Sequence, residues 1–277
     1  MNLPKKQVLE IIDNAIQEDI WTGDITGEAV IENQLKVEGI ILAKEAGLVA
    51  GLEVAELVFK RLDPKVKFQR LVAEGTRLKE GSKIARVNGE AKSILAGERL
   101  ALNFLQRMSA IATKTAYYQS LVEDYQVRIV DTRKTTPGLR ILEKYAVRVG
   151  GGSNHRLGLY DAVLIKDNHI TAAGGVEKAI RRARAKLPHT MQIEVEVESL
   201  AAVKEALAAQ ADIIMLDNMS LELMTEAVKI INGEAIVEAS GGITEENITQ
   251  VAATGVDVIS LGALTHTVAA LDISLEF

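Results

Sequence analysis

Basic side chains gather in one stretch of an otherwise acidic chain. The whole chain has 32 Lys and Arg against 38 Asp and Glu, a formal net charge of −6. Residues 128–168 reverse this balance, with eight basic residues (Arg128, Arg133, Lys134, Arg140, Lys144, Arg148, Arg156, Lys166) against four acidic ones (Asp131, Glu143, Asp161, Asp167). Arginine binds carboxylate and phosphate in a bidentate manner, whereas lysine offers a compact charge. The mixture predicts a ligand that carries both kinds of anion.

The basic residues of this stretch divide into two groups. Arg140, Lys144 and Arg148 are spaced four apart, which favours the solvated face of a helix. The better ligand candidates lie beside apolar runs or at the end of a glycine-rich loop, and they are Arg133, Lys134, Arg156 and Lys166. That loop, GGGSNHR (150–156), offers freely turning backbone N–H groups followed by His155 and Arg156. Taken alone, it is equally consistent with a plain loop and a structural histidine.

A run of alternating acids supplies the opposite charge. In QIEVEVES (192–199) the two-residue period of a strand places Glu194, Glu196 and Glu198 on one face. If that face is buried, the carboxylates require cations nearby, either lysines or a metal. With Asp217 at the end of the next apolar run and no cysteine in the chain, the hard oxygen ligands favour Mg²⁺ bridged to phosphates. The alternative is an edge strand with a wet acidic face.

Two later apolar runs end in small residues. Ser240-Gly241-Gly242 follows one run, and Gly262-Ala263 follows the next. Backbone amides at the ends of late barrel strands often bind phosphate. We therefore expect a phosphate cradle here, although two ordinary turns between strand and helix would have the same sequence.

Positioning these residues requires elements that end at a common edge. Six apolar runs alternate with helical segments, namely VRIVDTRK (127–134), DAVLIKDN (161–168), QIEVEVES (192–199), ADIIMLDN (211–218), EAIVEASGG (234–242) and VDVISLGA (256–263). This alternation predicts parallel strands in a closed or nearly closed α/β barrel. Each run ends in polar residues or glycine, and the carboxyl-terminal rim of such barrels holds the active site.

The first part of the chain has a different pattern. Short strand-like runs between residues 28 and 90 surround a helix near 52–61, and residues 93–124 have the spacing of a long helix. We expect an amino-terminal α/β sandwich over 1–112 and an incomplete, TIM-like α/β barrel over 113–265 that carries the site. Residues 266–277 are candidates to return to the first domain.

Composition limits the cellular location and the partners that we expect for this protein. The 277-residue chain has 48% hydrophobic residues, no cysteine and no apolar run of about 20 residues, the length that would cross a bilayer. Its amino terminus resembles an amphipathic helix more than a signal peptide. We expect a cytoplasmic protein without nucleic-acid or membrane partners, since its net charge is negative.

Taken together, several segments closely resemble quinolinate phosphoribosyltransferase. They are EDIWTGDIT (18–26), GERLALN (97–103), DTRKTTPGLR (131–140), KYAVRVGGGSNHRLGLYDAVLIKDNHI (144–170), EVEVES (194–199), LDN (216–218), EASGGI (238–243) and LGALTH (261–266). They follow the family's order through nearly the whole chain. The resemblance implies transfer of phosphoribosyl from phosphoribosyl pyrophosphate to quinolinate, with loss of carbon dioxide, in the biosynthesis of NAD.

The resemblance also implies roles for individual residues. Thr132, Arg133, His155, Arg156 and Lys166 would hold quinolinate. Lys134, Glu196 and Asp217 would act in catalysis on the ribose and pyrophosphate, and Glu196 and Asp217 would bind Mg²⁺. The 5-phosphate would lie against Ser240, Gly241, Gly242, Leu261, Gly262 and Ala263. The family works as a homodimer, in which Arg99 would reach into the partner's site.

Three other interpretations remain open at this point. A lyase could use Lys134 or Lys166 as a Schiff-base nucleophile. A carrier domain is suggested by the glycine turns of RLVAEGTRLKEGSKIARVNGE (70–90). A phosphoribosyltransferase that acts on another ring acid is the nearest rival to the quinolinate enzyme.

Overall fold

A computed structural model describes residues 3–277, so Met1 and Asn2, which begin the predicted amino-terminal helix, lie outside the described residues. The chain forms two compact units. Unit 1 contains residues up to Ala116 together with Thr135–Gly151 and Ala263–Phe277, and unit 2 contains Tyr117–Lys134 and Gly152–Gly262. The predicted boundary between residues 112 and 113 falls inside the long helix α4 (Ala91–Leu121).

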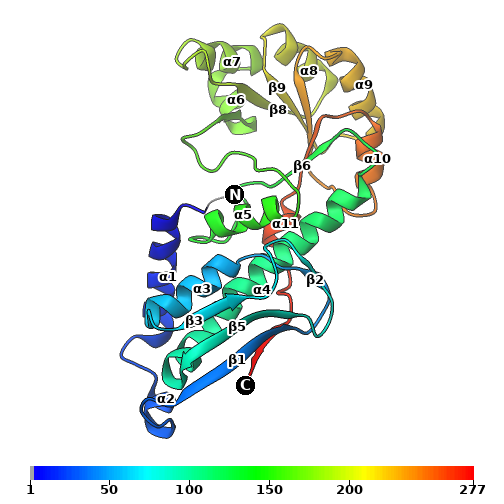
Figure 1. Cartoon of the computed structure of the whole chain (residues 1–277). Helices are drawn as coiled ribbons and strands as arrows, with labels where there is room; N and C mark the ends of the chain where they lie inside the picture. The colour runs from blue at the N-terminus through cyan, green and yellow to red at the C-terminus, as the bar shows by residue number, and fades with distance from the viewer. Residues whose placement is uncertain (1–2) are drawn as a thin grey trace. The chain divides into compact units, whose positions relative to one another are not determined.

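Unit 1 is built on an antiparallel sheet with the strand order β12-β1-β5-β3 (Figure 1). Its strands are β1 (Lys36–Ala43), β3 (Lys67–Arg70), β5 (Lys83–Glu90) and β12 (Ile273–Glu276), and β2 (Gly47–Leu48) pairs with β4 (Arg77–Leu78). Besides most of α4, its helices are α1 (Lys5–Ile20), α2 (Ile25–Val30), α3 (Leu52–Leu62), α5 (Arg140–Val149) and α11 (Ala263–His266). The last strand of the chain thus pairs with the first.

The sequence of α3 explains its place in this unit. Leu52, Val54, Ala55, Val58 and Phe59 are buried, whereas Lys60 is exposed. An apolar stripe of this spacing turns one helix face towards the core. The helix begins where the Glu74 carboxylate accepts the backbone N–H groups of Gly51 and Leu52, two donors that a helix start would otherwise leave unpaired.

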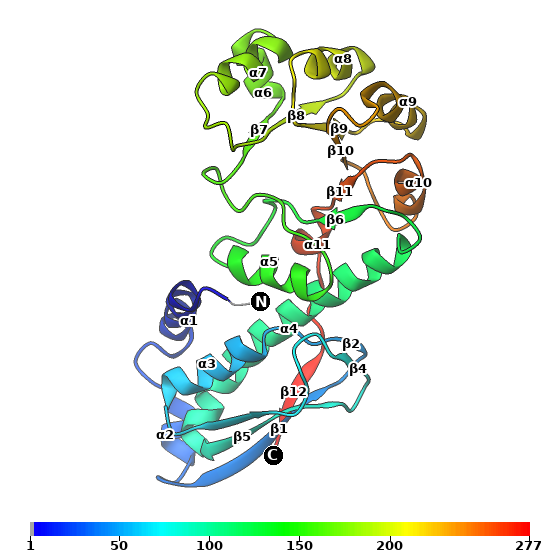
Figure 2. The ribbon, with the colours of Figure 1, turned by 45° about the horizontal axis from the view of Figure 1, so that its top comes forward.

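Unit 2 contains a six-stranded sheet in the order β6-β11-β10-β9-β8-β7, and every neighbouring pair is parallel. Its strands are β6 (Arg128–Val130), β7 (Val163–Ile165), β8 (Ile193–Val197), β9 (Ile213–Asp217), β10 (Ile236–Ser240) and β11 (Val258–Ser260). The connecting helices are α6 (Asp167–Ala173), α7 (Val176–Arg184), α8 (Leu200–Ala208), α9 (Leu221–Ile231) and α10 (Ile248–Ala253). Helices α7 to α10 follow one another along the outside of the sheet (Figure 2). The predicted fold class, an α/β sandwich with an incomplete α/β barrel, is confirmed.

The barrel is open because β6 and β7 are the two edge strands of the sheet. Each is only three residues long. The outer side of β6 is occupied by a short parallel bridge between Val130 and Ser153. The Ser153 N–H donates to the carbonyl of Ile129 at 2.9 Å, and Asp131 N–H donates to the carbonyl of Ser153 at 3.3 Å.

One expectation about the basic helix is wrong. Arg140, Lys144 and Arg148 were predicted to form a solvated face, and they do lie on α5, but Lys144 is only 1% exposed. The four-residue spacing indicates a shared helix face without indicating whether that face meets water.

Among residues 3–277, none of the helices combines the length and the apolar character needed to span a bilayer.

Candidate active site

The carboxyl ends of the barrel strands lie level with one another. Asp217 at the end of β9 pairs in register with Ser240 at the end of β10. On the other side, Ser260 of β11 pairs with Val130 of β6, and Ala239 pairs with Ile259. Residues that follow these strands therefore emerge at one rim, as the sequence pattern predicts.

A cavity of about 530 Å³ opens at this rim. Eleven of the predicted site residues line it, namely Thr132, Arg133, Lys134, His155, Arg156, Lys166, Glu196, Asp217, Ser240, Gly241 and Gly242. All of them belong to unit 2. The structure therefore gathers the basic residues, the acids and the glycine turn in one place.

The basic side chains occupy one part of the cavity wall. Arg133 and Lys134 are exposed, and Arg156 is half-buried. Burial and the charge of Arg133 lower the pKa of Arg156, whereas the charge of Glu194 opposes this change. An arginine keeps its charge under such conditions, so clustered cations of this kind favour an anionic ligand that relieves their repulsion.

Lys166 is paired with an acid of the cavity wall. Its Nζ donates to Oε2 of Glu196 at 2.5 Å, and its side chain is 45% exposed. The pair crosses from the end of β7 to β8. Because the lysine remains open to solvent, it can bind a substrate anion while it is also paired with Glu196.

Two carboxylates of the cavity wall, Glu196 and Asp217, belong to the adjacent strands β8 and β9. Burial raises the pKa of Asp217, and the negative charge of Glu196 raises it further. Asn218 Nδ2 donates to Asp217 Oδ2 at 2.9 Å. An acid pair whose charges repel each other beside an open cavity is a suitable ligand set for Mg²⁺, which prefers oxygen ligands.

The glycine turn after β10 allows close approach to the backbone. Gly241 and Gly242 have φ angles of 84° and 60°, and Asn218 on the neighbouring strand has φ 51°. A Cβ atom on Gly241 would lie 2.3 Å from Asn218 Oδ1. Only glycine fits there, and its conformation leaves backbone N–H groups accessible at the rim.

The remaining predicted residues are placed elsewhere. The wall of the cavity, as the described residues form it, includes neither Leu261, Gly262 nor Ala263. Leu261 is buried and its N–H donates to the carbonyl of Val130 at 2.9 Å. Gly262 is the last residue of unit 2, and Ala263 begins α11 in unit 1. Arg99 is exposed on α4, also within unit 1.

Several residues of the site were not among the sequence candidates. Leu164, Met215, Asn218 and Ser260 complete the cavity wall. Glu238 is only 4% exposed, and its Oε1 lies 3.6 Å from Nε2 of His155 in the cavity wall. Its position two residues before Ser240 on the same strand is the signal that could have identified it, since alternate residues share a face.

A second hollow of about 690 Å³ lies at the opposite, amino-terminal ends of the strands. Its carboxylates already serve the fold. Asp212 accepts from Arg184 Nη2 at 2.6 Å and from Ile193 N–H at 2.7 Å, and Asp257 accepts from Val237 N–H at 2.8 Å. The larger volume therefore does not mark the reactive site.

Fold and cavity together are typical of an α/β-barrel enzyme that acts on anionic substrates. The quinolinate phosphoribosyl transferase models match the chain, the amino-terminal domain over residues 24–109 and the carboxyl-terminal domain over 111–276. The chain belongs to the quinolinate phosphoribosyltransferase family. This membership confirms the predicted enzyme activity, transfer of phosphoribosyl to quinolinate with loss of carbon dioxide in NAD biosynthesis.

Individual relatives match this chain along almost their whole length. The chain is 45% identical over 270 residues to a probable nicotinate-nucleotide pyrophosphorylase (carboxylating) of Bacillus subtilis, covering 98% of this chain and 93% of that one. It is 47% identical over 273 residues to the protein of the same name in Synechocystis, covering 96% and 92%. A crystal structure of NadC from Streptococcus pyogenes has 45% identity and a TM-score of 0.96, covering 100% of this chain and 98% of that one.

Proposed function

We propose that the cavity at the rim of unit 2 is where this reaction takes place. The observation that carries the proposal is the presence of Arg133, Lys134, Arg156 and Lys166 in one cavity with the acid pair Glu196 and Asp217. Four cations suit quinolinate and phosphoribosyl pyrophosphate, because each of these substrates carries several negative charges. A cation-binding acid pair beside them suits the pyrophosphate end.

Quinolinate would bind at the side of the cavity formed by the ends of β6 and β7. Arg133 and Arg156 present planar guanidinium groups that match its two carboxylates, and Lys166 adds a compact charge. Thr132 lines the same side, where its Oγ1 accepts the Lys134 N–H at 3.0 Å. This arrangement would hold the ring nitrogen in one orientation towards the ribose, which is the main requirement for joining two bound substrates.

The phosphoribosyl donor would bind across the ends of β8, β9 and β10. Ser240, Gly241 and Gly242 would hold the 5-phosphate, and Lys134 would stabilise the pyrophosphate as it leaves. Positive charge develops on the ribose at the same time, and the carboxylates of Glu196 and Asp217 would stabilise it. No covalent intermediate with the protein is required.

Mg²⁺ is the cofactor that we propose for this step. Glu196 and Asp217 would hold the ion, and the negative charge of Glu196, which helps to raise the pKa of Asp217, supports this assignment. When bound, Mg²⁺ would neutralise charge on the pyrophosphate.

Loss of carbon dioxide follows from the chemistry of the substrate. Once the ring nitrogen carries the ribose it is cationic, and it stabilises the carbanion that remains when the bond to the neighbouring carboxylate breaks and carbon dioxide leaves. That ring carbon then takes up a proton from water to give nicotinate mononucleotide. The protein contributes by holding the remaining carboxylate and by excluding other orientations of the ring.

An assay of the purified protein tests this function. With Mg²⁺ and phosphoribosyl pyrophosphate, we expect quinolinate to give nicotinate mononucleotide, pyrophosphate and carbon dioxide in equal amounts, and nicotinate to give no product. The second carboxylate of quinolinate should decide which compound reacts, because a site with two arginines should bind a dicarboxylate far better than a monocarboxylate. Product from nicotinate at a similar rate would instead favour an enzyme for another ring acid.

We further propose that the protein is a homodimer in which Arg99 completes the site of the partner. The exposure of Arg99 on α4 supports this, since a long cation in solvent can serve another chain. Co-expressed Arg99→Ala and Arg156→Ala chains should recover about a quarter of wild-type activity, because half of randomly paired dimers carry one intact site out of two. Recovery of no activity, with both variants inactive alone, would contradict a shared site.

The cytoplasmic location stays a prediction. Cell fractionation, with the activity followed in each fraction, tests it directly.

A further inference from the structure

A fully buried carboxylate lies between two segments of the cavity wall. Asp131 is 0% exposed and follows β6 directly. The next residues along the chain, Thr132 and Arg133, line the cavity, whereas Asp131 is not part of the wall that the described residues form. Its carboxylate therefore acts on the protein and not on a ligand.

Both oxygens of Asp131 accept hydrogen bonds from the glycine-rich loop. Oδ1 accepts the backbone N–H of His155 at 2.9 Å, and Oδ2 accepts Nδ2 of Asn154 at 2.6 Å. The main chains of the two segments are joined as well, since the Asp131 N–H donates to the carbonyl of Ser153 at 3.3 Å. Removing one partner of a buried hydrogen bond is costly, because the other partner then stays buried and unsatisfied. Consecutive residues of the loop are thus fixed to the end of β6.

The segments that Asp131 joins carry the two arginines proposed to bind quinolinate. Arg133 follows Asp131 by two residues, and Arg156 follows His155 directly. Both arginines line the cavity, and the pKa of Arg156 is lowered by burial and by the charge of Arg133. Like charges in one wall repel each other, which favours separation of the segments that carry them. The hydrogen bonds of Asp131 oppose this separation at the backbone beside both arginines.

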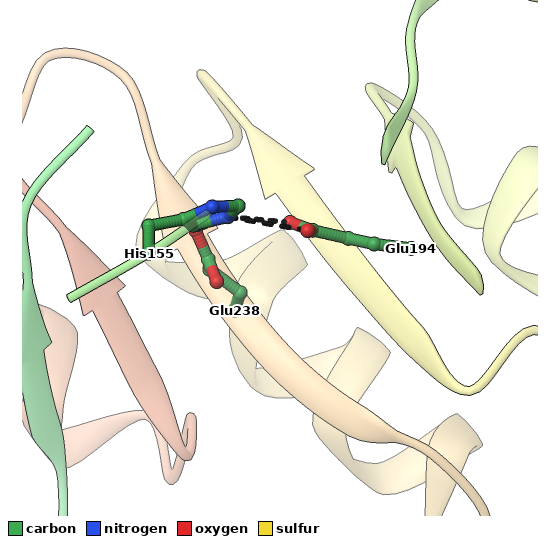
Figure 3. Close-up of side chains that lie close together, drawn as sticks. All are labelled: His155, Glu194 and Glu238. Atoms are coloured by element: carbon green, nitrogen blue, oxygen red, sulfur yellow. Dashed lines mark hydrogen bonds and ion pairs between the residues drawn. The ribbon is translucent and has the colours of Figure 1, made fainter. Parts of the chain in front are cut away.

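The side chain of His155 starts from this anchored backbone and reaches another strand. Its Nε2 lies 3.2 Å from Oε1 of Glu194 on β8 (Figure 3). The imidazole lines the cavity together with Arg156. The position of the His155 backbone, which Asp131 fixes, therefore helps to determine where the imidazole meets a ligand in the cavity.

We propose that Asp131 is a positioning residue that makes the site specific for a ligand with two adjacent carboxylates. By joining the end of β6 to the glycine-rich loop, it sets the spacing between the guanidinium groups of Arg133 and Arg156. Quinolinate has its carboxylates on adjacent ring carbons, so both bind well only when the two guanidinium groups have the matching spacing. The inference rests on the proposed function, and it leaves His155 with the substrate contact that the family resemblance implies.

Two unreactive analogues test this specificity by their binding alone. Phthalate carries carboxylates on adjacent ring carbons, as quinolinate does, but has no ring nitrogen to react, and isophthalate has one further carbon between its carboxylates. Titration calorimetry of the full-length protein should show at least about tenfold tighter binding of phthalate, because isophthalate leaves one guanidinium poorly matched. Equal affinities for the two compounds, or no binding of either, would overturn the proposal.

An exchange of side chains tests whether the bond between Asp131 and Asn154 is responsible. Asn154→Asp sets two carboxylates against each other, so the loop should move away from β6. We expect the preference for phthalate to fall to within about threefold and the KM for quinolinate to rise about tenfold, with the KM for phosphoribosyl pyrophosphate nearly unchanged. Adding Asp131→Asn restores a donor and an acceptor with their roles exchanged. The double variant should recover the preference and the KM for quinolinate to within about threefold of wild type.

Two further variants separate this effect from general damage. Asn154→Ala removes the donor without adding a charge, and its preference for phthalate should fall about threefold even if Asn154→Asp does not fold. Asn14→Asp makes the same charge change at an exposed position of α1 and should have wild-type values. Thermal unfolding of each variant shows whether it is folded.

The results distinguish this inference from the proposed function. If a folded Asn154→Asp protein keeps the wild-type preference, or if Asp131→Asn fails to rescue it, Asp131 does not set the spacing and the inference is wrong. Equal changes in both KM values would also contradict it, since a general distortion would then be the cause. If the exchange behaves as expected but the wild-type protein makes no product from quinolinate, the proposed function fails, whereas the role of Asp131 in selecting adjacent carboxylates stands.

Discussion

Replacing Arg156 with alanine is expected to lower kcat/KM for quinolinate by about a thousandfold, because truncating one partner of a desolvated charge pair costs about 4 kcal/mol. The guanidinium is half-buried in the cavity wall, and its Nη1 donates to the Ala162 carbonyl over a long distance of 3.5 Å. Its removal should therefore leave the melting temperature within about 2 °C of wild type, as for other substitutions outside the core. Steady-state kinetics and thermal unfolding measure the two effects separately.

The control for this experiment is Arg181→Ala. Arg181 lies on α7 of the same unit, where its exposed side chain pairs with Glu177 four residues earlier. The loss of such a surface pair should leave both kinetics and stability nearly unchanged. An Arg156→Ala enzyme with wild-type kcat/KM would show that quinolinate binds elsewhere.

Replacing Asp217 with asparagine is expected to lower kcat by about a hundredfold to a thousandfold, the effect of removing one group that stabilises transition-state charge. The substitution keeps the shape of the side chain and removes its negative charge. In enzyme stripped of metal with a chelator, titration with Mg²⁺ should restore wild-type activity, and the variant should need a much higher concentration of the ion. The rate as a function of Mg²⁺ concentration provides both numbers.

Asp124→Asn is the matched control, since Asp124 is exposed and precedes β6, outside the cavity. If Asp217→Asn had wild-type kcat and the same Mg²⁺ requirement, the acid pair would have no part in the reaction. The Mg²⁺ assignment would then have to move to other oxygen ligands.

Much of the barrel could be predicted because its strands are buried on both sides. IIML of β9 reads as one apolar run that ends at Asp217, and RIV of β6, VLI of β7 and VIS of β11 are also largely apolar, whereas IEVEV of β8 alternates with acids. Parallel strands bring their carboxyl ends to one edge, so the positions of Lys166 and Ser240 followed from the chain alone. The substrate did not follow from these patterns, and only the resemblance supplied it.

The degree to which each side chain is buried could not be predicted from the sequence. Glu194 and Glu198 share a strand face by their spacing, yet Glu194 is buried and Glu198 lies beyond the strand end in solvent. Lys144 is buried for a similar reason, since its surroundings come from the packed unit and not from its own helix. The surroundings of the His155 ring were also out of reach, because its Nε2 lies close to Glu194 and Glu238, which are 39 and 83 residues further along the chain.

The open barrel also has a consequence for solubility. An unclosed sheet leaves two edges with unpaired backbone groups, which can recruit strands from other chains and start aggregation. On β6 that edge is occupied by Ser153, two residues before His155. The segment that carries the anion-binding residues therefore also shields the sheet. Selection for catalysis and selection against aggregation act on the same few residues, and a change that frees this segment would expose the edge of β6 as well as disorganise the site.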